Sequence, residues 1–194
     1  MKFVLATFNR DKAREFAALL ALPGTEIVAL REWPEARPPE EDGGTLEHNA
    51  RIKARAAVQL TGLPAISDDT GLFVDALDGA PGVHAAHFAG PDATYADNVA
   101  RLLASLAGIP AERRTARFRT VCLALHPDGR EWLAEGVLEG RIGEREAGTH
   151  GFGYDPVFVL PDGRTLAELG ASEKNAISHR ALAVRGLATH LGGV

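Results

Sequence analysis

Short apolar runs alternate along the chain with longer stretches in which apolar residues recur at helical spacing. The runs predict strands at residues 2–6, 26–30, 65–67, 115–125, 131–140 and 157–160. The periodic stretches predict helices after residue 12 to about residue 22, from 45 to about 61, from 94 to 106, and from 178 towards 191. Strands and helices in mixed order, without repeats or a low-complexity linker, predict one α/β domain over residues 1–194.

Local signals support several of these boundaries. Pro23-Gly24 ends the first helix, Thr45 caps the second, and residues 94–97 form a capping box before the third. The Pro-Asp-Gly sequences at residues 127–129 and 161–163 are typical of turns between paired strands. A loop rich in proline and glutamate fills residues 31–44.

Composition limits the class of protein. With 194 residues and 45% hydrophobic content, the chain can form one sizeable core or two lobes. It shows no signal peptide and no apolar run near the roughly 20 residues of a membrane span, so we expect a cytoplasmic protein. The single cysteine, Cys122, lies in an apolar run and is expected to be a packed core thiol.

Charge narrows the class of ligand. The net charge of −5 argues against a general nucleic-acid binder but allows a local basic pocket for a nucleotide. Of the 21 basic residues only four are lysines, and Lys12, Lys53 and Lys174 all fall in the segments that carry candidate chemistry. An arginine-rich composition alone could also produce that distribution.

Residues 7–12, Thr-Phe-Asn-Arg-Asp-Lys, lie between a predicted strand and a predicted helix. Amides at a helix N-terminus favour an anion, and Asn9 and Lys12 add donors. The segment is not a Walker loop, since it lacks the glycines and the Gly-Lys-Thr/Ser ending. The alternative is ordinary helix capping by Asn9.

Acidic side chains occur at Glu40-Glu41 in the loop and at Asp68-Asp69 after the predicted strand 65–67. Carboxylates at the end of a strand suit Mg²⁺, which prefers oxygen ligands and retains several waters. A carboxylate base beside the metal makes water a competent nucleophile. The alternative is a solvated acidic turn.

The segment 151–180 combines glycines, aromatics, an acid and cations. Phe152 and Tyr154 are candidates to flank a base, with Asp155 as a proton acceptor from it. Lys174 and the pair at residues 179–180 are candidate donors to the base or to phosphate. The alternatives are that Phe152 is a core residue and that residues 179–180 form a solvated first helical turn.

Taken together, these motifs resemble the inosine/xanthosine triphosphate pyrophosphatases, a family that acts on non-canonical purine nucleoside triphosphates. The resemblance extends from Leu5 to Leu191. Its motifs are Thr7-x-Asn9-x-x-Lys12, Glu41-x-Gly43, Asn49-Ala50, Lys53, Ser67-Asp-Asp-Thr-Gly-Leu72, Ala80-Pro-Gly-Val83, Gly151-Phe-Gly-Tyr-Asp-Pro156, Glu173-Lys-Asn175 and Ser178-His-Arg180.

This resemblance implies an elongated mixed sheet with flanking helices, two lobes around a central cleft, and a homodimer. It also implies Mg²⁺-dependent hydrolysis of ITP, dITP or XTP to the monophosphate and pyrophosphate. Glu41 and Asp69 would bind the metal, Asp69 would accept the proton of the attacking water, and Lys12 would be the main phosphate cation. Substrate contacts are implied for Thr7, Phe8, Asn9, Arg10, Asp11, Lys12, Lys53, Thr70, Phe152, Gly153, Tyr154, Asp155, Lys174, His179 and Arg180.

The chain departs from the family pattern at Phe8 and His150, where small or flexible residues are usual, and at His87, where arginine is common.

Two alternatives to this function remain: a Maf-like pyrophosphatase that acts on pyrimidine or modified nucleotides, and a non-catalytic module that binds nucleotides. The acids Glu41, Asp68 and Asp69 count against the module, because a sensor does not need a hydrolytic acid set. No nucleic-acid or membrane partner is expected.

Overall fold

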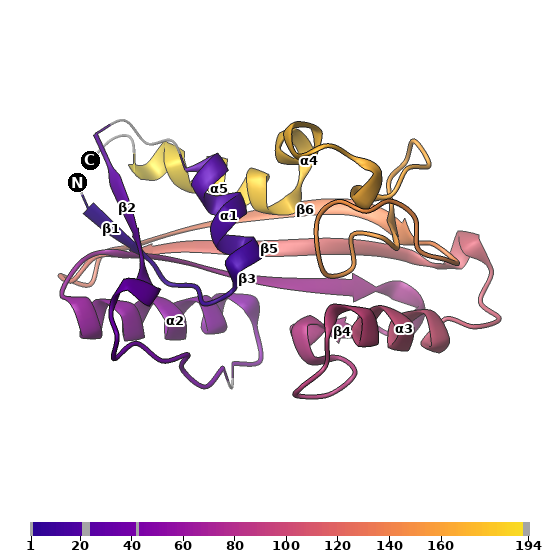
Figure 1. Ribbon diagram of the computed structural model, residues 1–194, viewed down its shortest axis with the longest axis horizontal. Helices are drawn as coiled ribbons and strands as arrows, with labels where there is room; N and C mark the ends of the chain where they lie inside the picture. The colour runs from indigo at the N-terminus through magenta and orange to yellow at the C-terminus, as the bar shows by residue number, and fades with distance from the viewer. Residues whose placement is uncertain (1, 21–23, 42, 192–194) are drawn as a thin grey trace. The chain divides into compact units, whose positions relative to one another are not determined.

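The computed structural model of the chain describes residues 2–20, 24–41 and 43–191 (Figure 1). The chain forms two compact units, each assembled from separate segments. Unit 1 comprises Met1–Asp69, Thr120–Gly136 and His179–Val194, and unit 2 comprises Thr70–Arg119 and Val137–Ser178. The interpretation of residues 1–194 as a single domain stays a prediction.

A mixed sheet provides the framework of the fold. Its strands are β1 (Lys2–Leu5), β2 (Glu26–Ala29), β3 (Ala65–Val74), β4 (Pro81–Gly82), β5 (Thr115–Leu125), β6 (Glu131–Ile142) and β7 (Phe158–Val159). The strand order is β2-β1-β3-β5-β6-β7, and β4 pairs with β3. β1 runs parallel to β2 and β3, whereas β4 and β7 pair antiparallel. The expected mixed sheet is thus confirmed.

In unit 1, helices cover both faces of the sheet. Successive side chains of a strand point to opposite faces, so β1 contributes to two apolar clusters. Phe3 and Leu5 pack with residues of α1 (Arg10–Leu19) and α5 (His179–Leu191). Val4 packs with residues of α2 (Leu46–Thr61). Figure 1 shows α1 and α5 on one side of β1 and β3, and α2 on the other.

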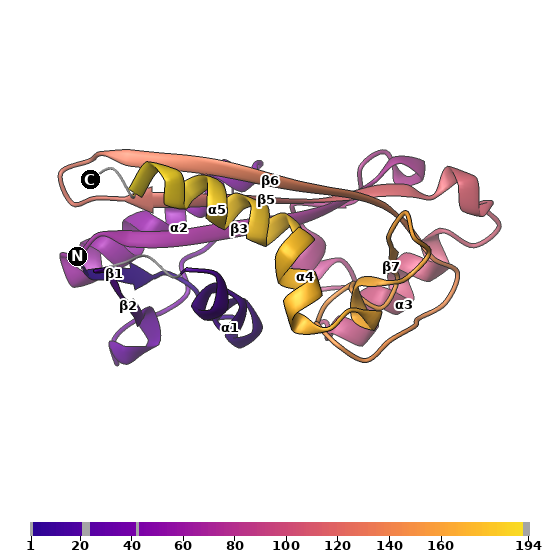
Figure 2. The same ribbon diagram turned by 90° about the horizontal axis from the view of Figure 1, so that it is seen from above.

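Unit 2 has its own apolar core, to which α3 (Tyr95–Ser105) contributes Val99 and Leu102, and Leu106 follows directly after the helix. The remaining helix, α4 (Ala171–Ile177), was not predicted from the sequence. Figure 2 shows α4 just ahead of α5 along the chain. Short 3-10 helices lie at Leu30–Glu32, Asp75–Leu77, Ala85–His87, Ala111–Arg113 and Leu166–Glu168.

Most predicted boundaries agree with the structure. The side chains of Thr45 and Thr94 cap α2 and α3, and α3 has the expected capping box. The turn after β5 is closed by His126, whose backbone N–H donates to the carbonyl of Arg130 (2.9 Å). The first helix ends at Leu19, and its predicted end at Leu22-Pro23 lies outside the described residues.

One prediction about the sheet was wrong. The strand expected at residues 65–67 continues to Val74, so Asp68 and Asp69 lie inside β3 and not after its end. Aspartate and glycine disfavour strands, but tertiary packing overrides that weak preference where the side chains find partners. Among the described residues, no helix is long and apolar enough to cross a membrane.

Candidate active site

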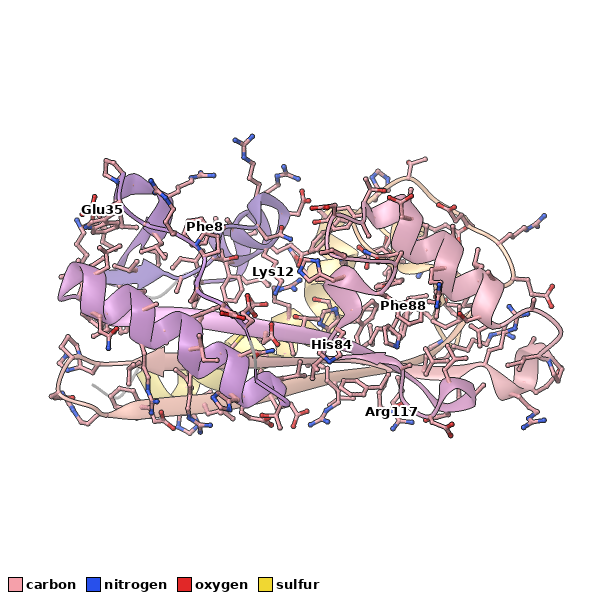
Figure 3. The ribbon with its side chains drawn as sticks, turned by 90° about the horizontal axis from the view of Figure 1, so that it is seen from below. Phe8, Lys12, Glu35, His84, Phe88 and Arg117 are labelled. Atoms are coloured by element: carbon pink, nitrogen blue, oxygen red, sulfur yellow. The ribbon has the colours of Figure 1, made fainter. Side chains whose placement is uncertain are left out.

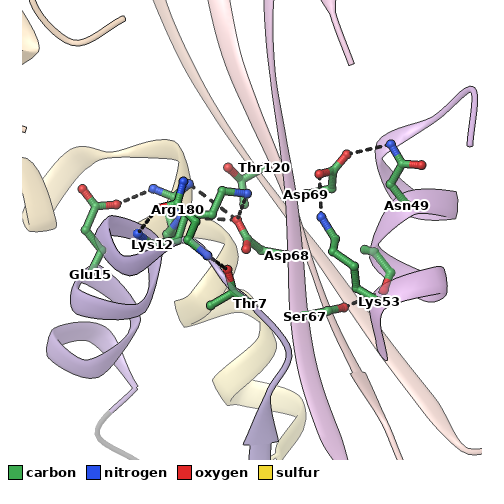
Figure 4. A network of polar contacts seen from close by, with 12 residues as sticks. Thr7, Lys12, Glu15, Asn49, Lys53, Ser67, Asp68, Asp69, Thr120 and Arg180 are labelled. Carbon is green, nitrogen blue, oxygen red and sulfur yellow. Dashed lines mark hydrogen bonds and ion pairs between the residues drawn. The ribbon is translucent and has the colours of Figure 1, made fainter. Parts of the chain in front are cut away.

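The two aspartates of β3 serve opposite faces of the sheet. Because side chains alternate along a strand, Asp68 points towards α1 and α5, whereas Asp69 points towards α2 (Figure 4). Ser67, two residues before Asp69, confirms the register, since its hydroxyl donates to the carbonyl of Ala50 in α2 (2.7 Å). The acidic pair in the sequence is therefore two separate sites.

Asp68 is almost fully buried among cations. Lys12 Nζ lies 3.0 Å from Asp68 Oδ2, and Arg180 Nε lies 3.4 Å from the same oxygen. Arg180 also binds Glu15 of α1 through a second guanidinium nitrogen. Burial alone would raise the pKa of Asp68, but the charges of Lys12 and Arg180 outweigh it and hold the pKa well below its usual value. The carboxylate therefore stays ionised and anchors both cations.

The segment before α1 has the geometry of a helix cap. Asn9 Oδ1 accepts hydrogen bonds from the backbone N–H groups of Asp11 (2.9 Å) and Lys12 (3.1 Å). Thr7 Oγ1 accepts from the N–H of Asn9 (3.2 Å). The capping alternative for Asn9 is thus confirmed, and it holds Lys12 at the start of the helix. Phe8, labelled in Figure 3, is 38% exposed.

On the other face, Asp69 is held by two residues of α2. Lys53 Nζ lies 2.7 Å from Asp69 Oδ1, and Asn49 Nδ2 donates to Asp69 Oδ2 (3.1 Å). The same ammonium lies 2.9 Å from Oε2 of Glu41. Burial would lower the pKa of Lys53, but the negative charges of Asp69, Asp68 and Glu41 raise it. Lys53 is therefore a charged bridge between two carboxylates.

This arrangement suits a divalent cation chemically. Two carboxylates, Glu41 and Asp69, converge on a single positive charge, and carboxylate oxygens are the ligands that Mg²⁺ prefers. Within the described ranges, no three His, Cys, Asp or Glu side chains form a metal-binding group. A site with two protein ligands matches Mg²⁺, which usually keeps several waters and binds substrate phosphates. Glu40 and Glu41 are both exposed, and Glu41 is the one whose carboxylate pairs with Lys53.

Unit 2 contains a second charged group, built around the buried carboxylate of Asp155. Its Oδ2 accepts from Lys174 Nζ (2.6 Å) and from the backbone N–H of Phe152 (2.8 Å). The Lys174 ammonium lies 5.0 Å from the centroid of the Phe152 ring. Gly151 has φ +73°, and a Cβ there would collide with the Asp155 carboxylate. The glycine lets the loop close around this acid.

Tyr154 belongs to the core of unit 2. Its ring packs among the buried apolar residues, and its hydroxyl donates to the carbonyl of Ala85 (2.8 Å). Burial raises the pKa of its phenol, so the group stays neutral. This packing assigns the ring to the core and leaves Phe152 as the aromatic candidate for a base.

The segment 151–180 is divided between the two units, since His179 and Arg180 belong to unit 1. Both are buried, which makes the alternative of a solvated first helical turn wrong. His179 Nδ1 lies 2.6 Å from the hydroxyl oxygen of Thr120, and Arg180 is bound to Asp68 and Glu15. Their role as nucleotide contacts stays a prediction.

The three lysines noted in the sequence share one feature. Lys12, Lys53 and Lys174 each form an ion pair with an aspartate that is less than 10% exposed. The remaining lysine, Lys2, pairs with an exposed glutamate at the surface. Three of the four lysines are therefore partners of buried carboxylates.

Two residues of these networks were not predicted as site residues. Glu15 lies three positions after Lys12 on α1, and Asn49 lies four positions before Lys53 on α2. Residues at these spacings share one face of a helix. Helical spacing from the candidate lysines was the sequence signal for both.

The substrate contact expected of Thr70 stays a prediction, whereas His87, His150 and Cys122 were noted for other reasons. Thr70 follows Asp69 in β3 and belongs to unit 2. His87 and His150 are exposed, and His87 Nδ1 lies 3.1 Å from the carbonyl of Pro91. Cys122 is completely buried in β5, which confirms the core thiol.

Comparisons with solved structures define the class of fold. A HAM1 protein from Coxiella burnetii superposes with a TM-score of 0.91 at 39% identity, covering 100% of both chains. The Ham1 protein of Staphylococcus aureus gives a TM-score of 0.88 at 34% identity, covering 100% of this chain and 99% of that one. The mixed sheet with flanking helices is thus one already seen in Ham1 proteins.

Sequence comparisons agree with this structural similarity and identify the family. The chain is 55% identical over 184 residues to a "dITP/XTP pyrophosphatase" of Symbiobacterium thermophilum, covering 94% of this chain and 91% of the relative. A protein of the same name from Geobacillus kaustophilus is 48% identical, with 94% and 90% covered. The Ham1 family model matches residues 3–190, and the chain belongs to the Ham1 family.

Proposed function

We propose that the chain is a hydrolase that cleaves non-canonical purine nucleoside triphosphates (ITP, dITP and XTP) to the monophosphate and pyrophosphate, with Mg²⁺ as cofactor. The observation that carries the proposal is the convergence of Glu41 and Asp69 on one cation. Relatives that are about half identical over nearly the full length carry the name dITP/XTP pyrophosphatase. Removal of such nucleotides from the nucleotide pool is the expected role.

The acidic side chains would hold the metal and activate water. Glu41 and Asp69 would bind Mg²⁺, and a bound divalent cation neutralises charge on phosphate oxygens. Asp69 would also accept the proton of the water that attacks the α-phosphorus, with pyrophosphate as the leaving group. Asn49 and Lys53 orient its two oxygens for that task.

The cations of unit 1 would bind the phosphates. Lys12 is oriented by Asp68 and is 17% exposed, and an ammonium can donate three hydrogen bonds. Lys53 would give a second positive charge beside Asp69, and the segment Thr7 to Asp11 would add donors next to Lys12. Phosphoryl transfer depends mainly on positioning and electrostatic stabilisation, which these residues would provide.

The residues of unit 2 would recognise the base. The ammonium of Lys174 is oriented by Asp155 and would donate a hydrogen bond to the base. A 6-oxo purine accepts such a hydrogen bond, whereas the 6-amino group of adenine leaves the donor unpaired. Phe152 offers a ring face for stacking, and the proposed base contacts are Phe152, Gly153, Asp155 and Lys174.

A nucleotide panel tests the proposal. Pyrophosphate release is measured with ITP, XTP, dITP, GTP and ATP, each with and without Mg²⁺. We expect rapid, metal-dependent release from ITP, dITP and XTP and at least about 100-fold lower kcat/KM for ATP, since a site built to bond the 6-oxo group is left unpaired by adenine. Equal hydrolysis of ATP and ITP would refute the recognition of the 6-oxo group.

The same assay, extended to the pyrimidine nucleotides UTP and dTTP, separates the alternatives. A non-catalytic module would bind nucleotides but release no pyrophosphate even with Mg²⁺. A Maf-like enzyme would prefer pyrimidine or modified nucleotides, and membership of the Ham1 family argues against it.

A homodimer in the cytoplasm completes the proposal. The dimer rests on the resemblance to the pyrophosphatase family, and light scattering on the purified protein tests it. The location fits an enzyme that acts on free nucleotides, and the net charge of −5 does not favour nucleic acid as a partner.

A further inference from the structure

We propose that Asn49 is a positioning residue that fixes the proton-accepting carboxylate of Asp69 relative to the loop that carries Glu41. This inference rests on the proposed function, because it concerns the same acidic site. Asn49 lies in the first turns of α2 and is 5% exposed. Its side-chain amide joins two segments of unit 1 that are more than twenty residues apart along the chain.

The orientation of the amide follows from its partners. Asn49 Oδ1 lies 3.0 Å from the backbone N–H of Gly43, and Asn49 Nδ2 lies 3.1 Å from Asp69 Oδ2. A backbone N–H can only donate, so it requires the oxygen of the amide. The amide nitrogen is then committed to the carboxylate. The only standard side chain of this length that supplies both groups is asparagine.

Two residues of one helix together hold both oxygens of Asp69. Asn49 and Lys53 are four positions apart on α2 and therefore share a face. Lys53 Nζ binds Oδ1, and Asn49 Nδ2 binds Oδ2. A carboxylate that is hydrogen-bonded at both oxygens cannot rotate without breaking one contact. The orientation of Asp69 is therefore set by the neutral donor as well as by the cation.

The loop side of the contact is equally constrained. A Cβ added to Gly43 would collide with Asn49 Oδ1 and would lie 3.1 Å from the backbone nitrogen of Asn49. Glycine at this position lets the chain approach the amide, two residues after Glu41. Asn49 thus connects the backbone beside one proposed metal ligand to the carboxylate of the other.

The consequence for the reaction is geometric. A misplacement of about 1 Å can cost about 100-fold in rate, because proton acceptor and water must be aligned. Residues that orient metal ligands typically contribute about 10- to 100-fold in metal affinity or activity. Asn49 contacts neither nucleotide nor water in this role, so its loss is expected to lower kcat far more than it raises KM.

The test compares Asn49→Asp and Asn49→Ala with the matched control Gln59→Glu, which makes an amide-to-carboxylate change at an exposed position of the same helix. Asn49→Asp keeps the acceptor for Gly43 but removes the donor to Asp69. We expect a fall in kcat of about 100-fold with KM within about 3-fold, and wild-type kinetics for Gln59→Glu. Gly43→Ala disturbs the same contact from the loop and should give the same split between kcat and KM.

A second measurement does not depend on turnover. Mg²⁺ binding to the protein without nucleotide is measured by calorimetry, and Asn49→Ala is expected to weaken it about 10-fold or more. If folded Asn49→Ala or Gly43→Ala keeps wild-type kcat and Mg²⁺ affinity, the positioning role is refuted. A third outcome is possible, in which the wild type binds Mg²⁺ but releases no pyrophosphate from any nucleotide, and Asn49→Ala binds Mg²⁺ more weakly. In that case the proposed reaction fails while the role of Asn49 stands.

Discussion

The ammonium of Lys174 lies 2.6 Å from Oδ2 of Asp155, and the two side chains are only 7% and 4% exposed. Transfer of two charges from water into a protein interior is costly, and the pair offsets that cost only while both partners are present. Unit 2 therefore holds a charged pair that matters for stability. Removal of one charge should lower the free energy of unfolding far more than removal of both.

Lys174→Met should strongly destabilise the protein. It leaves the buried carboxyl group of Asp155 without the cation that neutralises it, at an expected cost of about 3–5 kcal/mol in the free energy of unfolding. The measurement is urea denaturation followed by circular dichroism. The double variant Lys174→Met/Asp155→Asn removes the buried charge and should recover at least half of the loss.

The matched control is Lys2→Met at the exposed pair with Glu26, where the side chains are 46% and 64% exposed. Exposed ion pairs contribute about 0–1 kcal/mol, so this variant should change stability little. Equal losses in Lys2→Met and Lys174→Met would contradict the distinction between the two pairs.

The assignment of metal binding to Glu41 and not to its neighbour gives a second prediction. Both glutamates are exposed, but it is Glu41 whose carboxylate pairs with the Lys53 ammonium that also binds Asp69. Glu41→Gln should raise the Mg²⁺ concentration for half-maximal activity by about 10-fold or more, since it removes one ligand charge. Glu40→Gln makes the same change one residue away and should behave as the wild type. A larger effect in Glu40→Gln would reassign the ligand.

Lys12 gives a third prediction, which concerns the phosphates. Lys12→Met should lower kcat/KM by about 100-fold or more, because it removes a charge aimed at the phosphates in the transition state. Arg14→Met is the control, since Arg14 is 79% exposed and pairs with the nearby Asp11 at the surface. Thermal unfolding of both variants checks the fold, because Lys12 also neutralises the buried Asp68. Full activity in a folded Lys12→Met protein would rule out this role.

The elements that could be predicted from the sequence are those specified by neighbouring residues. The cap at Thr45 and the apolar spacing after it predict α2 within one residue of its observed ends. The Pro-Asp-Gly turn and its apolar flanks likewise predict the β5–β6 hairpin. Each of these signals lies within a few residues of the structure it specifies.

The extension of β3 depends instead on distant residues. Asp68 is tolerated inside the strand because Lys12 and Arg180, from the two ends of the chain, neutralise it. The seven-residue helix α4 is too short to show a periodic apolar stripe, and such helices depend on tertiary packing. Neither feature has a local signal that single-sequence reasoning can use.

The candidate residues of the site could be predicted from the sequence, but the contacts between them could not. The motifs pointed to Glu41, Asp69 and the lysines, yet which lysine meets which acid depends on the alternation of side chains along β3. The sequence predicted a strand that ends at residue 67. It therefore gave no sign that Asp68 and Asp69 lie inside β3 and face different helices. The contribution of Asn49 follows only when α2 and β3 are seen together (Figure 4).

Cys122 provides a fourth prediction, on pH dependence. Burial, with a smaller contribution from the nearby charge of Asp68, raises the pKa of its thiol in the folded protein. Above the unfolded pKa of about 8.5 only the unfolded chain releases this proton, so stability falls as pH rises, by about 1.4 kcal/mol per pH unit. Cys122→Ala should be less stable at pH 7 but lose stability less steeply between pH 8 and 10. Parallel curves for the two proteins in guanidinium denaturation would show that the thiol does not contribute.

The fifth prediction concerns the proton acceptor itself. Asp69→Asn keeps the shape of the side chain and an oxygen for Lys53, but removes the charge and most of the basicity. Loss of a general base typically costs about 100- to 10,000-fold, so pyrophosphate release from ITP should nearly stop. Nucleotide binding, measured by calorimetry with a non-hydrolysable analogue, should be largely retained, because Lys12 and the residues of unit 2 are unchanged. Asp75→Asn, at an aspartate that is 48% exposed and pairs with Arg117, serves as the control and should keep wild-type turnover. Near-normal turnover in Asp69→Asn would transfer the base to another residue, whereas loss of turnover together with loss of nucleotide binding would assign Asp69 to binding alone.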